Sequence, residues 1–199
     1  MVKALLIVDV QNDFCEGGSL AVAGGTAVAR AVSGYLADDP RYAHIVATND
    51  YHVDPGGHFS DRPDYRTSWP PHCVVGTRGA RFHPDLDITR VEAVFRKGTH
   101  AAAYSGFEGA DKDGTPLAEW LREHGVDEVD LVGIATDYCV RATAADAAGA
   151  GFAARVLLDL TAGVTPESTE QAMEELTEAG VELTGTPLLR HEVPGLGGP

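Results

Sequence analysis

The chain has 199 residues, which is enough for one well-buried domain and too few for two domains of ordinary size. It carries 15 Lys and Arg against 30 Asp and Glu, a formal net charge of −15, and no run rich in basic residues. This excludes a typical nucleic-acid-binding protein, because affinity for phosphate backbones depends on clustered cations. A hydrophobic content of 44% excludes a mainly disordered chain.

Short apolar segments alternate with longer amphipathic ones, a pattern typical of βα units in a mostly parallel sheet. In chain order, we predict strands at 4–9, 45–49, 91–95, 129–134, 153–158 and 181–184. We predict helices at 26–36, 116–124, 138–148 and 166–179, with Thr115 and Thr165 as N-caps before prolines. The fold class is therefore α/β: a three-layer α/β/α domain with a doubly wound, mostly parallel sheet.

The ends of the chain bear on domain organisation and location. We predict a single domain over 1–193 and a frayed Gly/Pro-rich tail at 194–199. The first apolar stretch stops at Asp9, too early for a signal peptide or a membrane span, so we expect a cytoplasmic protein without a membrane partner. The three cysteines are odd in number, which favours free thiols. Helices on both faces leave room for a homo-oligomer, but no interface patch stands out.

The segment 50–87 breaks the alternating pattern. It holds five of the 11 prolines and four of the 8 histidines, without a sustained helical or strand period. Irregular segments of this length are usually functional or disordered. Its aromatic residues provide apolar area for packing, so we predict an ordered, functional loop; they are Tyr51, Phe59, Tyr65, Trp69 and Phe82.

Polar and reactive residues collect where the predicted strands end. Asp9 ends the first strand, Asp50 follows the second, Arg96 and Lys97 follow the third, and Ala135 follows the fourth, shortly before Cys139. In open parallel sheets, ligands bind at this carboxyl edge. Cys139 is expected in the first turn of a helix, where free amide protons favour a thiolate, although the same position suits a small buried hydrophobic side chain.

Asp9 and Lys97 each have two readings. Asp9 ends a buried run, and partial desolvation raises a carboxyl pKa toward the range of a general acid or base, although Asp13 is an equally acidic neighbour. Lys97 is one of only three lysines. It can pair with Asp9 and lower the pKa of the thiol, or extend its ammonium group into solvent from the strand end.

The loop also contains a candidate metal site. Its ligands would be one carboxylate and three imidazoles, from Asp50, His52, His58 and His72. This set suits zinc, iron or manganese better than calcium or magnesium, which prefer oxygen ligands. The histidines could instead hydrogen-bond to loop carbonyls. His83 is a further imidazole candidate, and Cys73 could replace its neighbour as a thiolate ligand.

Five blocks follow one another along the chain: DVQNDFC-x-GG from Asp9, D-x-H from Asp50, WPPHC from Trp69, KG from Lys97 and GIATDYCV from Gly133. Over residues 4–185 they resemble a nicotinamidase (pyrazinamidase) of the isochorismatase-like cysteine hydrolases. The resemblance implies an isochorismatase-like, Rossmann-like fold. It also implies conversion of nicotinamide to nicotinate and ammonia through a Cys139 thioester, hydrolysis of pyrazinamide, and a role in NAD salvage.

The resemblance also implies roles for individual residues. The catalytic triad would be Asp9, Lys97 and Cys139, and one divalent transition metal ion, with no organic cofactor, would be held by Asp50, His52, His72 and His58. The backbone amides of Ala135 and Cys139 would form an oxyanion hole after a cis peptide between Ile134 and Ala135. Walls of the nicotinamide site would come from Phe14, Trp69, Tyr104 and Ile134.

Three other functions remain open from the residues. N-carbamoylsarcosine amidases and ureidoacrylate hydrolases share the triad, so the substrate could be another small amide. A metal-dependent binding or storage module would carry Cys139 merely as a buried side chain. An isochorismatase-like vinyl-ether hydrolase would share the fold without needing a reactive cysteine. The histidine loop is the feature that favours a nicotinamidase among these.

Overall fold

The computed structural model describes residues 1–38 and 41–189. Six strands form one sheet in the order β3-β2-β1-β4-β5-β6, and all neighbouring strands are parallel. The strands are β1 (Val2–Val8), β2 (His44–Asp50), β3 (Ala93–Lys97), β4 (Val126–Ile134), β5 (Ala153–Ala162) and β6 (Glu182–Thr184). The chain winds outward in one direction from β1 and in the other from β4, which confirms the predicted doubly wound sheet.

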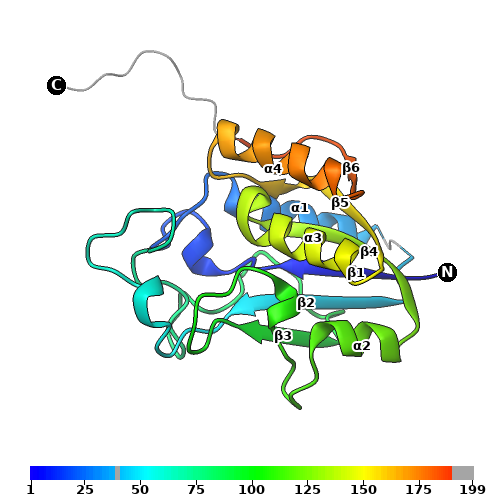
Figure 1. The fold of residues 1–199 in the computed structure, drawn as a ribbon, viewed down its shortest axis with the longest axis horizontal. Helices are drawn as coiled ribbons and strands as arrows, with labels where there is room; N and C mark the ends of the chain where they lie inside the picture. Colours follow the sequence, from blue (N-terminus) through cyan, green and yellow to red (C-terminus); the bar gives the residue numbers. More distant parts are fainter. Residues whose placement is uncertain (39–40, 190–199) are drawn as a thin grey trace.

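Helices cover both faces of the sheet (Figure 1). They are α1 (Gly25–Ala37) on one face, and α2 (Leu117–Glu123), α3 (Arg141–Gly149) and α4 (Pro166–Glu178) on the other. In β1, Leu5 and Ile7 pack in the cluster with α1, whereas Leu6 and Val8 pack in the cluster with the other helices. Because both faces are covered, β1 is apolar at every position from Ala4 to Val8.

Two strands extend further than their apolar runs indicated. Asp50 and Lys97 were expected after strands, but each is the last residue of its strand, and Arg96 also lies within β3. The ladder between β2 and β3 continues through the pairs Asn49–Arg96 and Asp50–Lys97. On its other side, Arg96 exchanges backbone hydrogen bonds with Ala110. Backbone pairing does not require an apolar side chain, so the predictions ended β2 and β3 too early at their first polar residues.

Other boundaries also differ from the predictions. β5 continues to Ala162, past a register shift against β4 between Leu131 and Gly133. Thr165 is the N-cap of α4, as predicted, and its hydroxyl accepts a hydrogen bond from the Ser168 amide at 3.1 Å. Thr115 is not a cap, because Pro116 occupies the N-cap position of α2.

The predicted helix at 138–148 is two elements. A π-helical turn, Thr136–Val140, comes first, and α3 follows it directly. Cys139 therefore lies in the π-helical turn and not in the first turn of an α-helix. π-Helical turns inside helical segments are rare and are frequently found at functional sites.

The long connection between β2 and β3 is irregular, as predicted, with one short 3₁₀ turn at Gly56–His58. Isolated bridges join His52 to Val74 and Phe59 to Trp69 within it. None of the described helices is long and apolar enough to cross a membrane. The predicted tail at 194–199, and the last residues of the predicted domain 1–193, lie outside the described residues.

Candidate active site

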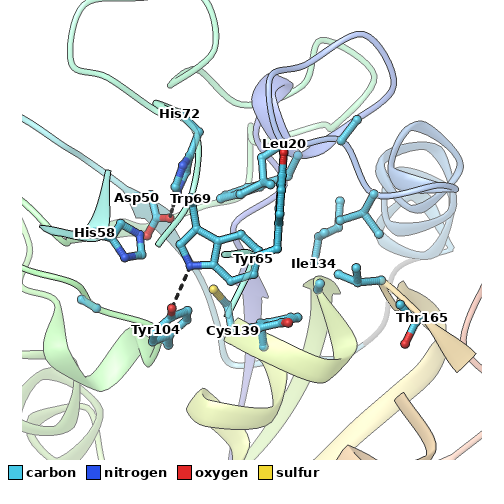
Figure 2. Close-up of a pocket in the computed structure, with 17 residues that line it drawn as sticks. Leu20, Asp50, His58, Tyr65, Trp69, His72, Tyr104, Ile134, Cys139 and Thr165 are labelled. Carbon is cyan, nitrogen blue, oxygen red and sulfur yellow. Dashed lines mark hydrogen bonds and ion pairs between the residues drawn. The ribbon is translucent and has the colours of Figure 1, made fainter. Parts of the chain in front are cut away.

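A cavity of about 360 Å³ lies at the carboxyl edge of the sheet (Figure 2). Its lining includes the last residues of β2 and β4, Asp50 and Ile134. The winding direction of the sheet reverses between β1 and β4, and ligands bind at such reversal points. Most of its lining is apolar or aromatic, and it includes all four predicted wall residues: Phe14, Trp69, Tyr104 and Ile134. The position and lining are those of a small-molecule site.

The three predicted catalytic residues meet beside this cavity. Lys97 Nζ lies 2.8 Å from Asp9 Oδ2 and 3.6 Å from Cys139 Sγ. Asp9 follows β1 with a φ of 50°, and its Oδ1 accepts a hydrogen bond from the Thr48 hydroxyl at 2.7 Å. Asp9 and Lys97 are almost completely buried, and Cys139 is buried except where it lines the cavity.

Burial determines the charges of this group. It raises the pKa of the Asp9 carboxyl, an effect that Lys97 only partly opposes. It also raises the pKa of the Cys139 thiol well above its usual range; Lys97 opposes this shift and the two nearby carboxylates reinforce it. Burial lowers the pKa of Lys97, but Asp50 and Asp9 outweigh it and hold that pKa well above its usual range. Burial of Cys139 thus acts against the thiolate that a helix N-terminus favours.

Asp9 has an oxygen available as a proton acceptor. Its Oδ2 is buried and forms the ion pair with Lys97, but the geometry gives it no hydrogen bond within the described part of the chain. A buried carboxylate oxygen in this state, with a raised pKa, can accept a proton from the neighbouring thiol of Cys139. Transfer of this proton to Asp9 would convert Cys139 into a thiolate nucleophile.

The predicted metal ligands form a second group at the buried end of the cavity. One ring nitrogen from each of His52, His58 and His72 lies within 4.8 Å of the others, and all three side chains are buried. Asp50 Oδ2 lies 3.4 Å from His52 Nε2 and 3.7 Å from His72 Nε2. Its other oxygen, Oδ1, accepts a hydrogen bond from Lys97, so one ammonium group touches both groups of the site.

The hydrogen bonds of the imidazoles fit a metal ion. His52 Nδ1 donates to the Gly98 carbonyl at 2.6 Å, and His72 Nδ1 donates to the Pro70 carbonyl at 2.8 Å. Because a carbonyl only accepts, Nδ1 is the donor in both rings, and the other nitrogen, Nε2, faces Asp50 Oδ2. Among the described residues, His52 Nε2 and His58 Nδ1 are buried without a hydrogen-bond partner. Ring nitrogens oriented in this way are typical metal ligands.

His58 is also in the right protonation state for a ligand. Burial, reinforced by repulsion from His72 and His52, lowers its pKa to about 4. The ring is therefore neutral at pH 7, the form in which imidazole binds metals. Three imidazoles and one carboxylate suit a first-row divalent ion.

Three supporting residues were not identified from the sequence: Thr48, Gln11 and Gly98. The Gln11 amide holds the backbone of Asp50 from both sides, donating to its carbonyl at 2.9 Å and accepting from its amide at 2.8 Å. A Cβ atom at Gly98 would lie 2.5 Å from His52 Cε1. Each could have been found from the sequence. Gln11 and Gly98 belong to the DVQNDF and KG blocks, and Thr48 is a polar residue in a mostly apolar strand.

The two additional metal-ligand candidates are not part of the described histidine cluster. His83 Nδ1 accepts a hydrogen bond from the Asp85 amide at 3.2 Å. The Cys73 amide donates to Asp13 Oδ2 at 2.7 Å, and burial raises the pKa of the Cys73 thiol well above its usual range. Asp13, the acidic neighbour of Asp9, therefore supports the loop backbone.

The segment after β4 forms the floor of the cavity. The peptide between Ile134 and Ala135 is cis, and Ala135 and Cys139 both line the cavity. Gly133 has a φ of 118°, and a Cβ atom there would lie 2.1 Å from the Val8 carbonyl oxygen. Glycine is therefore required for the close approach of β4 to β1 at this point.

Aromatic side chains enclose the space above the cysteine. The Trp69 indole donates to the Tyr104 hydroxyl at 2.9 Å, a contact visible in Figure 2. The Phe14 ring packs against His72 with centroids 5.5 Å apart. Tyr138, which was not predicted as a site residue, contacts Trp69 edge-on at 5.2 Å. A flat ring between these groups would have apolar contact on both faces.

The chain is similar to known proteins over most of its length. The Mycobacterium tuberculosis nicotinamidase/pyrazinamidase is 65% identical over 182 residues, covering 92% of this chain and 98% of that protein. The structure of Pyrococcus horikoshii pyrazinamidase in complex with zinc has a TM-score of 0.79 at 40% identity and covers 92% of this chain and 99% of its own. L. infantum PnC1 in complex with nicotinate has a TM-score of 0.81 at 35% identity, with 95% and 96% covered. The family model for the isochorismatase domain matches residues 3–187, and the chain belongs to this family.

Proposed function

We propose that the protein hydrolyses nicotinamide to nicotinate and ammonia, and pyrazinamide in the same way. One observation carries the proposal: a cysteine flanked by a buried acid and a lysine shares a ring-sized cavity with a cluster of metal-type ligands. The similarity to proteins named nicotinamidase or pyrazinamidase supports the choice of substrate. We also propose a cytoplasmic role in NAD salvage, which the similarity to nicotinamidases supports.

The first chemical steps use Cys139 and Asp9. Asp9 accepts the thiol proton, and the sulfur attacks the carboxamide carbon while Lys97 stabilises the charged pair. The negative charge that develops on the carbonyl oxygen is stabilised by the backbone amides of Ala135 and Cys139. Loss of one such donor typically costs about a hundredfold or more in rate.

The later steps reverse the proton transfer. The C–N bond breaks, Asp9 returns its proton to the nitrogen, and ammonia leaves a thioester on Cys139. Asp9 then accepts a proton from water as the water oxygen attacks the thioester carbon. The C–S bond breaks, the sulfur regains its proton, and nicotinate leaves.

We propose that Asp50, His52, His58 and His72 hold one divalent ion: zinc, iron or manganese. Such an ion supplies a Lewis-acid position for a ring nitrogen and so orients the substrate. Phe14 and Trp69 would enclose the two faces of the ring, with Tyr104 and Ile134 at its edges. The zinc in the Pyrococcus horikoshii relative supports a metal of this kind.

The test is ammonia release from nicotinamide by the purified protein, with elemental analysis of the same sample. Cys139→Ala should abolish release. Cys15→Ala is the matched control, because Cys15 is also a buried free cysteine but lies outside the cavity. Release by Cys139→Ala, or no release by folded, metal-loaded wild type, would contradict the proposal.

A further inference from the structure

Two imidazoles outside the active site, those of His44 and His124, lie beside each other at the amino edge of the sheet. His44 is the first residue of β2 and Asp50 is the last, so about 20 Å of strand separates His44 from the histidine cluster. His124 is the C-cap of α2, the helix beside the start of β2, and Trp120 of that helix contacts His44 edge-on (Figure 1). The two rings therefore form a pair of their own.

The geometry of this pair matches that of two residues in the histidine cluster. The ring centroids of His44 and His124 are 5.0 Å apart, and the ring planes are inclined at 78°. For His52 and His72 the corresponding values are 5.0 Å and 84°. Rings at this separation can bind one ion through nitrogens that lie about 2.0–2.1 Å from it. The pair at the amino edge thus has the spacing of two ligands of one ion.

Each ring of the pair also uses its Nδ1 atom for a hydrogen bond within the protein. His44 Nδ1 donates to Glu92 Oε2 at 3.0 Å, and His124 Nδ1 donates to the Trp120 carbonyl at 2.7 Å. Glu92 is itself held in place, because its Oε1 accepts from the Ile45 amide at 3.2 Å. Among the described residues, neither Nε2 atom has a hydrogen-bond partner. An acceptor on one ring nitrogen is the usual support of a histidine that binds a metal through the other.

Solvent reaches both rings. His124 is exposed, and the side chain of His44 is 21% exposed. The indole of Trp120 stacks on one face of the His124 ring, with centroids 3.7 Å apart, and so limits its rotation. This stack covers a ring face, whereas the lone pair of Nε2 lies in the ring plane. Two oriented imidazoles with room for water ligands suit a first-row divalent ion, and the net charge of −15 favours a cation.

We propose that His44 and His124 form a second metal site, which binds one divalent transition metal ion and prefers Cu²⁺ to Zn²⁺. The two Nε2 atoms are the protein ligands, water completes the coordination, and Glu92 orients the ring of His44. The preference follows from the general affinity order of divalent ions for nitrogen ligands. The inference goes beyond the proposed function, because none of these residues lines the active-site cavity.

The test follows Cu²⁺ binding through the fluorescence of Trp120, because a paramagnetic ion bound beside the indole quenches its emission. The Trp69→Phe protein is used, since Trp120 is then the only tryptophan. Quenching should saturate with one ion at this site. Glu92→Gln should weaken binding by about tenfold to a hundredfold, and His124→Ala should weaken it further, because a ligand is lost. His100→Ala is the matched control, because His100 is also exposed but is outside the pair.

His124→Ala also changes the surroundings of Trp120, so equilibrium dialysis with elemental analysis counts the copper bound per chain. Saturable binding that His124→Ala and His44→Gln each remove, and His100→Ala keeps, supports the second site. Absence of quenching, or equal copper binding by His124→Ala and His100→Ala, overturns it. Tighter binding of Zn²⁺ than of Cu²⁺ in competition overturns the assigned preference. Ammonia release by His124→Ala tests the proposed function separately.

Discussion

Asp130 and Asp9 are buried carboxylates on neighbouring strands of the same sheet, and their surroundings differ. Asp130, within β4, accepts hydrogen bonds from the Tyr42 hydroxyl at 2.5 Å and from two nitrogens of Arg155 at 3.0 and 2.6 Å. Asp9, just beyond β1, accepts one hydrogen bond from Thr48, and its second oxygen has only an ion-pair contact.

The difference separates structural groups from reactive ones. Asp130 uses both oxygens to join β4, β5 and the segment before β2, so its charge is committed to the fold. Five buried side-chain atoms of the described residues lack a hydrogen bond, and three of them belong to the site: Asp9 Oδ2, His52 Nε2 and His58 Nδ1. Because an unsatisfied buried polar atom is costly, such a concentration indicates a place where a ligand or a reaction supplies the missing partner.

The largest expected effect comes from replacing the unsatisfied carboxylate. Asp9→Asn cannot accept the thiol proton, so kcat for nicotinamide should fall by about 10²- to 10⁴-fold while the fold is retained. Ammonia release under saturating substrate, with circular dichroism of the same sample, measures both. A fall of less than tenfold would remove Asp9 from the role of base.

The next effect tests how the imidazoles are oriented. Gly98→Ala places a methyl group against His52, so zinc affinity should fall by about tenfold to a hundredfold. Gly114→Ala is the control: its φ is also positive, 86° against 76° for Gly98, but nothing lies within 4 Å of the added carbon. Competition with a chelator measures the affinities. Equal losses in both variants would trace the effect to backbone strain alone.

The satisfied carboxylate should show the opposite result. Asp130→Asn removes charge-assisted hydrogen bonds from Arg155 and leaves the cavity untouched, so the free energy of unfolding should fall by about 1–3 kcal/mol with kcat unchanged. Urea unfolding and ammonia release measure the two quantities. If Asp130→Asn lost activity and kept its stability, the division between the two carboxylates would be wrong.

The smallest effect concerns Glu16, a carboxylate that is mostly exposed. Burial raises its pKa, but hydrogen bonds from Thr26 and Gly24 together outweigh burial and lower the pKa to about 2. A lowered folded pKa adds stability above the ordinary value of 4.5, and that stability is lost as the pH falls toward 2. Solvent screening limits it to about 0.5 kcal/mol.

Glu16→Gln should therefore reduce the free energy of unfolding at pH 7 and have almost no effect near pH 2. Thermal unfolding of both proteins across this range measures the difference. A gap between the two proteins that widened toward low pH would contradict the assigned hydrogen bonds.

Much of the fold was predictable because periodicity reports burial directly. The alternation of apolar strands and amphipathic helices predicted the three layers and the sheet, and the confirmed N-cap at Thr165 is a purely local signal. The predicted strand ends were wrong where backbone pairing continues beyond the apolar residues, as at Asp50 and Lys97. Periodicity carries no information on hydrogen bonds between distant strands.

The sequence indicated which residues form the site, but not how burial and neighbouring charges shift their pKa values. Asp9, Lys97 and Cys139 were candidates because of their positions at the ends of predicted strands and because of the family resemblance, and the structure places them together. The burial that raises the pKa of the Cys139 thiol depends on packing by segments far away in sequence. Gln11 supports Asp50 across 39 residues, a contact that no local pattern reveals.

Asp50 pairs with Lys97 in the β2–β3 ladder, so the position of the Lys97 ammonium group depends on the register of these two strands. Neighbouring residues of a strand point to opposite faces, so a slip of one residue would turn the ammonium group of Lys97 away from Asp9 and toward the other layer. β3 is an edge strand of five residues whose outer side is bridged by Ala110. The bridge to Ala110 therefore helps to fix the register of β3 against β2. Insertion or deletion of a single residue in β3 should disturb the active site far more than the sheet.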